Sequence, residues 1–280
     1  MATELKVALC AIMKNEADYV EEWLAFHILQ GVSRVLLYDN NSSDDTRRRA
    51  RSFAQQVTIR VVPWSGPPDK FDLTQRLAYA DGARRLAGAV DYAAFIDLDE
   101  FLFASDYRPL GQVLGGFPAD TAAIAVNQRV FGSAAQVSAS EDLVTSRFTK
   151  AAAADHPEGH WFKTVARPER IVGFDTVHSV VLNSGAYVLS DGQPLPPRPD
   201  HPGHSSVVPE GALQLHHYIL KSREEFERKK SRAGPDLKSR YTDDYFESRD
   251  KSINAVSDER LTRFVAPIEQ MIGRARSESR

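Results

Sequence analysis

Phe95-Ile96-Asp97-Leu98-Asp99-Glu100-Phe101 runs from an apolar stretch directly into three acids. Crowded carboxylates repel one another and are costly to bury unless a positive group neutralises them. A hard divalent cation such as Mg²⁺ or Mn²⁺ prefers oxygen ligands and meets that need. If the chain stays extended, Asp97 and Asp99 point to the same side, so one carboxylate can bind a metal and the other a sugar or ribose. The alternative interpretation is a solvated turn with acidic caps.

The chain before this stretch alternates between patterns typical of strands and of helices. Strands are predicted from short apolar or β-branched runs, and helices from apolar residues that recur at helical spacing. The predicted strands are residues 5–13, 34–38, 57–62 and 92–96, and the predicted helices are residues 15–30, 44–54 and 71–87. This alternation favours a parallel sheet with crossover helices.

Polar residues follow three of these predicted strands. They are Lys14-Asn15-Glu16, Asp39-Asn40-Asn41 and Asp97-Leu98-Asp99-Glu100. In parallel sheets, ligands bind beyond the carboxyl ends of the strands. The Asp39 carboxylate can accept a hydrogen bond from the imide N–H of uracil or the amino edge of guanine. The stretch from Asp39 to Asp44 is equally suited to capping the next helix, so both interpretations stay open.

The second half of the chain is less regular. Short strands are predicted at residues 122–128, 163–166, 177–182, 186–189 and 213–218, and helices at residues 222–233 and 261–272. Small and polar side chains predict a long, mobile excursion over residues 131–159. Many prolines predict a surface loop over residues 191–209. We find no internal repeat and no linker between separate cores.

Composition narrows the class of protein. The 280 residues are 42% hydrophobic and 26% charged, and Lys+Arg 35 against Asp+Glu 38 gives a formal net charge of -3. This balance argues against nucleic acid as a partner. The single cysteine, Cys10, allows no intrachain disulfide and is expected to fill the core. The sequence shows neither a secretory signal nor an apolar stretch of membrane-spanning length, so we expect a cytoplasmic protein, with peripheral membrane association left open.

An ordered series of motifs resembles the family 2-like and family 92-like glycosyltransferases of the GT-A fold. The resemblance extends from about residue 7 to residue 234. It is carried by Met13-Lys14-Asn15-Glu16, Tyr19, Glu22-Trp23, His27, Gly31, Tyr38 to Asp44, Asp97 to Phe101, Phe131-Gly132-Ser133, Arg147-Phe148, His178-Ser179, His217-Tyr218, Lys221-Ser222 and Glu225-Phe226. It implies an α/β fold of GT-A type, with a Rossmann-like, mostly parallel sheet, flanking helices and a less regular acceptor-side half. We expect one domain, with a nucleotide-binding half to about residue 104, an acceptor half to about residue 240 and a C-terminal helical segment.

The resemblance also implies roles for individual residues. Those implied to approach the nucleotide or the donor sugar are Asn15, Glu16, Asp39, Gln75, Asp81 and Asp97. Asp99 would be the direct ligand of Mn²⁺ or Mg²⁺, with Asp97 beside it. A late histidine would be a further ligand, and His217 is favoured over His216, because alternation along a strand puts only one of them on the site side. The candidates to neutralise the leaving diphosphate are Lys163, Lys229 and Arg232.

The acceptor side is less defined. Trp161 is the candidate for stacking on an acceptor sugar. A general base must take the proton of the acceptor hydroxyl. The candidates are Glu141, Asp142, Asp155, Glu158, Asp175 and His178. No spacing singles one of them out, and the acidic pair that marks the base in family 2 is not evident in a recognisable setting.

The leading hypothesis is a metal-dependent glycosyltransferase. It would move a hexose from a nucleoside diphosphate sugar, with UDP favoured, to a hydroxyl of a glycan or related acceptor, with inversion at the anomeric carbon. One alternative is a nucleotidyltransferase or sugar-nucleotide hydrolase, although Lys14-Asn15-Glu16 is not the Gly-rich phosphate loop that such enzymes usually carry. Another is a non-catalytic module that binds a nucleotide sugar or glycan.

Overall fold

The computed structural model describes residues 4–67, 69–232, 238–239 and 241–278, except for the side chain of Arg232. Its first half has the alternation that the sequence predicts. The elements are β1 (Val7–Met13), α1 (Val20–Leu29), β2 (Val32–Asp39), α2 (Thr46–Arg51), the 3-10 helix η1 (Ser52–Gln55), β3 (Thr58–Pro63), α3 (Phe71–Leu86) and β4 (Tyr92–Phe95). The first helix begins later than predicted, because residues 15–19 form a turn that starts with Asn15 at a positive φ of 55°.

The second half adds shorter elements. They are β5 (Glu100–Ala104), α4 (Leu110–Leu114), β6 (Thr121–Val130), α5 (Val144–Arg147), β7 (Lys150–Ala151), η2 (Pro157–His160), β8 (Phe162–Ala166), η3 (Pro168–Arg170), β9 (Ile171–Phe174), β10 (Val180–Leu182), β11 (Ala186–Leu189), β12 (Leu213–His217), α6 (Arg223–Arg232), α8 (Asp243–Ile253), β13 (Val256–Ser257), η4 (Thr262–Phe264) and α9 (Val265–Glu278). Neither β5 nor α8 is predicted from the sequence, and the terminal helix α9 lies several residues later than predicted.

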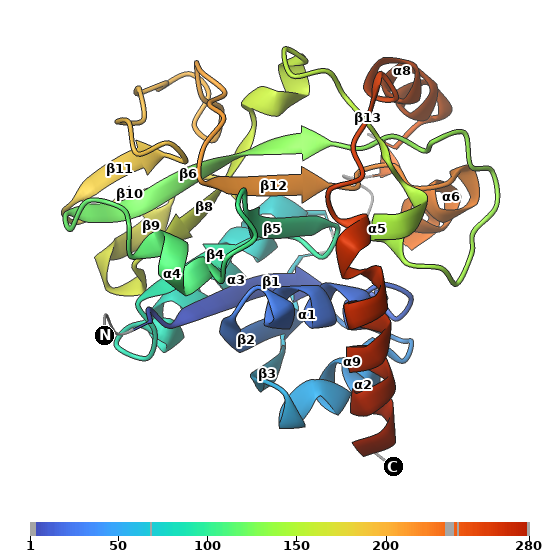
Figure 1. Ribbon diagram of the computed structural model, residues 1–280, viewed down its shortest axis with the longest axis horizontal. Helices are drawn as coiled ribbons and strands as arrows, with labels where there is room; N and C mark the ends of the chain where they lie inside the picture. The colour runs from blue at the N-terminus through green and yellow to red at the C-terminus, as the bar shows by residue number, and fades with distance from the viewer. Residues whose placement is uncertain (1–3, 68, 233–237, 240, 279–280) are drawn as a thin grey trace.

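The main sheet joins the two halves of the chain. Its strands follow the order β3-β2-β1-β4-β8-β6-β12-β5, and β11 pairs with β6. The strands β3, β2, β1 and β4 are mutually parallel, whereas β8 is antiparallel to both β4 and β6. The chain thus has the predicted α/β fold, with a mostly parallel sheet and flanking helices (Figure 1). The carboxyl ends of β1, β2 and β4 lie at one edge of it, as predicted.

Helices cover both faces of the parallel part (Figure 1). On one face, α1 packs between the sheet and α9, and Trp23, Leu24 and Phe26 are fully buried there. On the other face, α3 packs on β1, β2 and β4 through Ala78, Tyr79 and Ala83. Burial of these apolar side chains is the main stabilising contribution to the layers.

Gly82 allows α3 to approach β1 closely. A Cβ at this position would clash with the sulfur of Cys10, which is fully buried in β1. Burial raises the pKa of the Cys10 thiol far above its ordinary value, in agreement with its predicted role as a core residue.

The region predicted as a long excursion is tied to the body of the protein. The carboxylate of Glu22 on α1 accepts hydrogen bonds from the backbone N–H groups of Val144 and Thr145, at 2.7 and 2.9 Å. Arg147 forms a buried bidentate ion pair with Glu225 on α6. These contacts hold α5 between α1 and α6. Within the described ranges, no helix is both long enough and apolar enough to cross a membrane.

Candidate functional site

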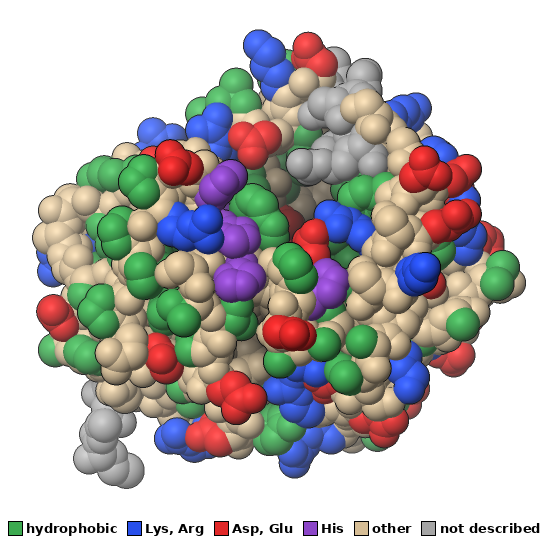
Figure 2. Space-filling model, turned by 90° about the horizontal axis from the view of Figure 1, so that it is seen from above, with side chains coloured by type: hydrophobic (Ala, Val, Ile, Leu, Met, Phe, Trp, Pro, Cys, Tyr) green, Lys and Arg blue, Asp and Glu red, His purple; other side chains and the backbone are tan. Residues whose placement is uncertain are grey.

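The three acids after β4 form a turn instead of the extended segment predicted from alternation. The backbone N–H of Glu100 donates to the carbonyl of Asp97 at 3.1 Å, and β5 starts at Glu100. The N–H of Tyr218, just after β12, donates to the carbonyl of Asp99 at 2.8 Å. The acidic turn, residues 97–100, is therefore held between β4 and β12, and its side chains meet different partners. A hollow with histidine, acidic and basic side chains around it is visible on one face of the molecule (Figure 2).

Asp97 is held by α3 and β8. Its Oδ1 accepts from Gln75 Nε2 at 2.5 Å and from the Tyr79 hydroxyl at 3.2 Å, and its Oδ2 accepts from Lys163 Nζ at 2.7 Å. Burial by itself raises the pKa of the Asp97 carboxyl, but the Lys163 ammonium outweighs it and holds the pKa below its ordinary value. Burial would likewise lower the pKa of Lys163, but Asp97 and Glu100 raise it to about 12. Gln75 and Lys163, candidates for the nucleotide and the diphosphate, thus both lie at the acidic turn.

Asp99 contacts α6 and β12. Lys229 Nζ donates to its Oδ2 at 2.8 Å, and His217 Nε2 lies 3.5 Å from its Oδ1. Burial raises the pKa of the Asp99 carboxyl, but Lys229 and His217 together hold it well below the ordinary value. Lys229, predicted as a contact of the diphosphate, thus lies against Asp99. The side chain of Arg232, the other candidate on this helix, lies outside the described residues.

Glu100, for which the sequence predicts no separate role, is fully buried at the centre of the cluster. Its Oε2 accepts from the backbone N–H of Asp97 at 2.8 Å and lies 3.5 Å from Lys163 Nζ. Its Oε1 has no hydrogen-bond partner among the described residues and lies 3.6 Å from His217 Nδ1. Burial raises the pKa of the Glu100 carboxyl to about 7 against the opposing effect of Lys163.

The two neighbouring histidines of β12 lie on opposite sides of the strand, as alternation predicts. His216 is fully buried among aromatic rings, and its Nε2 lies 3.0 Å from the Arg260 guanidinium. His217 faces the acidic turn.

Gln128 on β6 sets the tautomer of His217. Gln128 Nε2 donates to the carbonyl of Glu158 at 2.9 Å, so its Oε1 is the atom that faces His217 Nδ1, at 2.7 Å. An amide oxygen only accepts, so Nδ1 carries a proton and Nε2 is the nitrogen that faces the Asp99 carboxylate, at 3.5 Å. Either a proton on Nε2 or a metal cation between Nε2 and Asp99 Oδ1 satisfies both atoms.

The ends of β1 and β2 are locked together. The Asn15 backbone N–H donates to Ser42 Oγ at 3.0 Å, its Oδ1 accepts from the Ser43 N–H at 2.8 Å, and the Glu16 N–H donates to Thr46 Oγ1 at 2.7 Å. The loop after β2 therefore caps α2 and also contacts the residues that follow β1.

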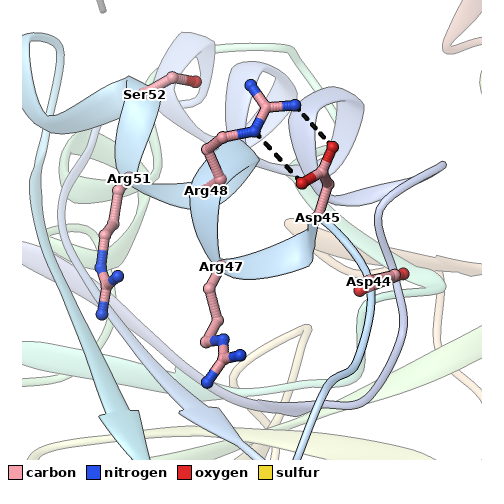
Figure 3. Close-up of a pocket in the computed structure, with 6 residues that line it drawn as sticks. All are labelled: Asp44, Asp45, Arg47, Arg48, Arg51 and Ser52. Carbon is pink, nitrogen blue, oxygen red and sulfur yellow. Dashed lines mark hydrogen bonds and ion pairs between the residues drawn. The ribbon is translucent and has the colours of Figure 1, made fainter.

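Asp39 is nearly inaccessible to solvent at the end of β2. Its Oδ1 accepts from the Ser42 N–H at 3.2 Å, and its Oδ2 lies 3.6 Å from the Arg47 guanidinium. Arg47 also lines a surface pocket of about 590 Å³ together with Asp44, Asp45, Arg48, Arg51 and Ser52. Arg47 and Arg51 point the same way in this pocket, whereas Arg48 turns back to pair with Asp45 (Figure 3). The acidic turn is not part of this pocket.

Asp81 is not brought to the acidic turn. It lies further along α3 than Gln75, where it accepts from the Tyr38 hydroxyl at 2.7 Å and forms an ion pair with Arg85. Burial raises the pKa of its carboxyl, but the hydrogen bond with Arg85 and the one from Tyr38 lower it below the ordinary value. The Asp81 carboxylate also forms an ion pair with Arg84.

The candidates for a general base are scattered. Four of them, Glu141, Asp142, Asp155 and Asp175, are exposed at the surface. Glu158 pairs with Arg249 at 2.7 Å. His178 alone among them packs against Trp161, with ring centroids 5.1 Å apart. Burial, and after it Lys163, lowers the pKa of His178 to about 3.

Comparison with known proteins gives one family. The family model "Glycosyltransferase family 92" matches residues 4–244. A glycosyltransferase family 92 protein of Oryza sativa subsp. japonica is 27% identical over 201 residues, which are 67% of this chain and 31% of that protein. One of Arabidopsis thaliana is 25% identical over 228 residues, which are 76% of this chain and 35% of that protein. The chain thus spans about a third of the length of these relatives.

Among solved structures, that of S. aureus TarS in complex with UDP-GlcNAc aligns with a TM-score of 0.40 and 12% identity. The alignment covers 62% of this chain and 49% of TarS.

Proposed function

The chain belongs to glycosyltransferase family 92, and from its site we propose that it transfers a hexose from a nucleoside diphosphate sugar to a hydroxyl of a glycan or related acceptor. UDP is the favoured nucleotide, and the resemblance to family 2-like enzymes favours inversion at the anomeric carbon. The observation that carries the proposal is the placement of His217 Nε2 3.5 Å from Asp99 Oδ1, next to Lys229 at the edge where the parallel strands end.

The donor set fits a divalent cation that shares its coordination with a substrate. Within the part of the chain that the structure describes, no group of three or more His, Cys, Asp or Glu side chains could hold a metal. Mg²⁺ is usually bound through one or two carboxylates plus substrate phosphates and water, and imidazole is an acceptable ligand of Mn²⁺. Asp99 and His217 would hold such an ion, and Asp97 would lie beside it. When bound, the cation neutralises the charge that develops on the leaving diphosphate.

A buried lysine, Lys163, and a partly buried one, Lys229, add fixed positive charge to the same edge. Lys163 and Lys229 each contact one aspartate of the acidic turn, so both ammonium groups are positioned before a substrate arrives. Preorganised charges stabilise a developing anion without reorganisation of the site. We assign both lysines to the diphosphate, and Asn15, Glu16 and Asp39 to the nucleoside at the locked ends of β1 and β2.

The acceptor would enter from the side of Trp161, whose ring offers a face for a sugar. His178 lies next to Trp161, but a pKa of about 3 disfavours it as the base that takes the proton of the acceptor hydroxyl. The proposal therefore leaves the base unassigned.

Calorimetric titration with UDP, with and without Mn²⁺, tests the proposal. We expect Mn²⁺ to strengthen UDP binding in the natural chain and to have no effect in Asp99→Asn. Asp106→Asn is the matched control, because Asp106 is an exposed carboxylate paired only with nearby Arg108. If Mn²⁺ does not change the affinity of the natural chain for UDP, the metal assignment is contradicted. A thermal-shift screen of nucleotide sugars then identifies the donor.

A further inference from the structure

Two histidine rings stack beside the candidate site on a rigid frame. The rings of His160 and His204 have centroids 5.1 Å apart and planes only 12° from parallel. Their backbones are tied together, because the Ser205 N–H donates to the His160 carbonyl at 2.9 Å. The side-chain amide of Asn127 on β6 also donates to the His160 carbonyl and to Ser205 Oγ, at 3.2 and 2.8 Å. The pair is therefore held in place by the main sheet.

The two rings have opposite tautomers. His160 Nδ1 lies 2.9 Å from the carbonyl of Ser205, which only accepts, so this nitrogen carries a proton and the lone pair of the neutral ring is on Nε2. His204 Nδ1 lies 2.9 Å from the guanidinium of Arg198, which only donates, so this nitrogen accepts and the proton is on Nε2. Burial, and then the neighbouring Arg198, lowers the pKa of His204 and favours its neutral form. The neutral stack thus offers one acceptor nitrogen and one donor nitrogen, on two rings whose centroids are 5.1 Å apart.

Aromatic rings connect this pair to the acidic turn. The centroid of the Trp161 ring lies 5.3 Å from that of His204 and 5.1 Å from that of His178. His178 in turn lies close enough to Lys163 and Asp97 for both charges to affect its pKa. Histidine side chains gather on one side of the hollow in Figure 2. If the donor sugar lies at the acidic turn, the side of the hollow lined by these histidines is left for the acceptor.

We infer that His160, His204 and Trp161 form a binding subsite for the acceptor, and that its ligand is a saccharide with a pair of adjacent hydroxyls. One hydroxyl donates to His160 Nε2, and its neighbour accepts from the N–H at His204 Nε2. The apolar face of the sugar ring packs on Trp161. A sugar hydroxyl both donates and accepts, so a neighbouring pair matches this arrangement. The inference rests on the proposed transferase function, because it places the acceptor of that reaction.

The tautomers are measured first, since they require no ligand. Two-bond ¹H–¹⁵N correlation spectra of the histidine rings should show the proton on Nδ1 for His160 and on Nε2 for His204. Assignment uses the variants His160→Phe and His204→Phe, which keep a flat ring but remove both nitrogens. The same tautomer in both rings would overturn the inference.

Binding is then measured by saturation-transfer NMR with the methyl glycosides of mannose, galactose and glucose as probes. We expect ring-proton signals from at least one probe, and an affinity roughly tenfold lower in either Phe variant, as for one lost hydrogen bond. His201→Ala is the matched control, because His201 is an exposed neighbour whose ring lies 6.2 Å from that of His204. No signal from any probe, or equal loss in the His201 control, would reject the subsite.

Titration of UDP with Mn²⁺ separates this inference from the proposed function. The Phe variants should bind UDP as the natural chain does, because the histidine pair does not contact the acidic turn. If sugar binding depends on the pair but Mn²⁺-dependent UDP binding is absent, then the proposed donor site fails and the subsite stands. The opposite result would leave the donor site and remove the subsite.

Discussion

His217 of β12 lies directly opposite Glu100 of β5 in an antiparallel pair, and this register brings the imidazole to the acidic turn. The ring lies between two carboxylates, with Nδ1 3.6 Å from Glu100 Oε1 and Nε2 3.5 Å from Asp99 Oδ1. The two residues are more than 100 positions apart in the sequence, so the candidate site depends on how the second half of the chain pairs with the first.

Gln128→Leu should weaken Mn²⁺ binding while leaving the fold intact. Gln128 keeps the proton of His217 on Nδ1, and residues that orient a metal-binding histidine typically contribute about 10–100-fold to metal affinity. The measurement is Mn²⁺ titration in the presence of UDP, followed by electron paramagnetic resonance. Gln214→Leu is the control, because Gln214 also lies on this part of the sheet but contacts Gly211 and Arg260. Equal Mn²⁺ affinity in the Gln128 variant and the natural chain would contradict this role.

Arg147→Met should destabilise the fold by about 3–5 kcal/mol, because it leaves Glu225 as a buried carboxylate without its ionic partner. The double variant Arg147→Met, Glu225→Gln should recover much of the loss. Free energies of unfolding from urea denaturation measure both. Arg108→Met, which breaks an exposed ion pair with Asp106, should cost about 0–1 kcal/mol. A small loss in the Arg147 variant would show that α5 and α6 do not depend on the pair.

The stability of the folded chain should fall as pH is lowered below 6.5, in part because of His27. Burial lowers the pKa of this ring in the folded state to about 3, whereas the unfolded chain binds the proton near pH 6.5. Between these values only the unfolded state gains the proton, so the stability falls by up to ~1.4 kcal/mol per pH unit from this group.

His27→Gln tests this effect, because its amide can still donate to the Trp23 carbonyl and accept from the Leu102 N–H. Urea unfolding between pH 5 and pH 7 should give a shallower slope of stability against pH in this variant. The exposed His201→Gln should keep the natural slope. Parallel slopes in all three proteins would mean that His27 is protonated in the folded state.

Gly82→Ala should destabilise the fold by about 1–3 kcal/mol, since the added methyl group must displace Cys10 or move α3 away from β1. Combining it with Cys10→Ala should reduce the loss. Gly273→Ala is the control, because nothing lies near that position on α9 and alanine favours helix. Thermal unfolding of these three variants and of the natural chain measures the effects, and a neutral Gly82→Ala would show that the contact between α3 and β1 is loose.

The sequence by itself determined the parallel core and the kinds of residues at its edge. The alternation of apolar runs and helical patterns is a local property, because hydrogen bonds within helices and burial on sheet faces impose periods of 3.6 and 2 residues. The same alternation separated His217 from His216. It failed for Asp97 and Asp99, because hydrogen bonds from Glu100 and Tyr218 bend the chain into a turn that periodicity does not encode.

Only the tertiary structure decided which charges meet. Lys163 forms an ion pair with Asp97, and Lys229 forms one with Asp99. Gln128 accepts a hydrogen bond from Nδ1 of His217. Each of these contacts joins strands and helices that are far apart in the sequence. The stacked pair of His160 and His204 likewise depends on a bridge between two loops. Such pairings follow from strand register and burial, which are properties of the whole folded chain, so local pattern cannot reveal them.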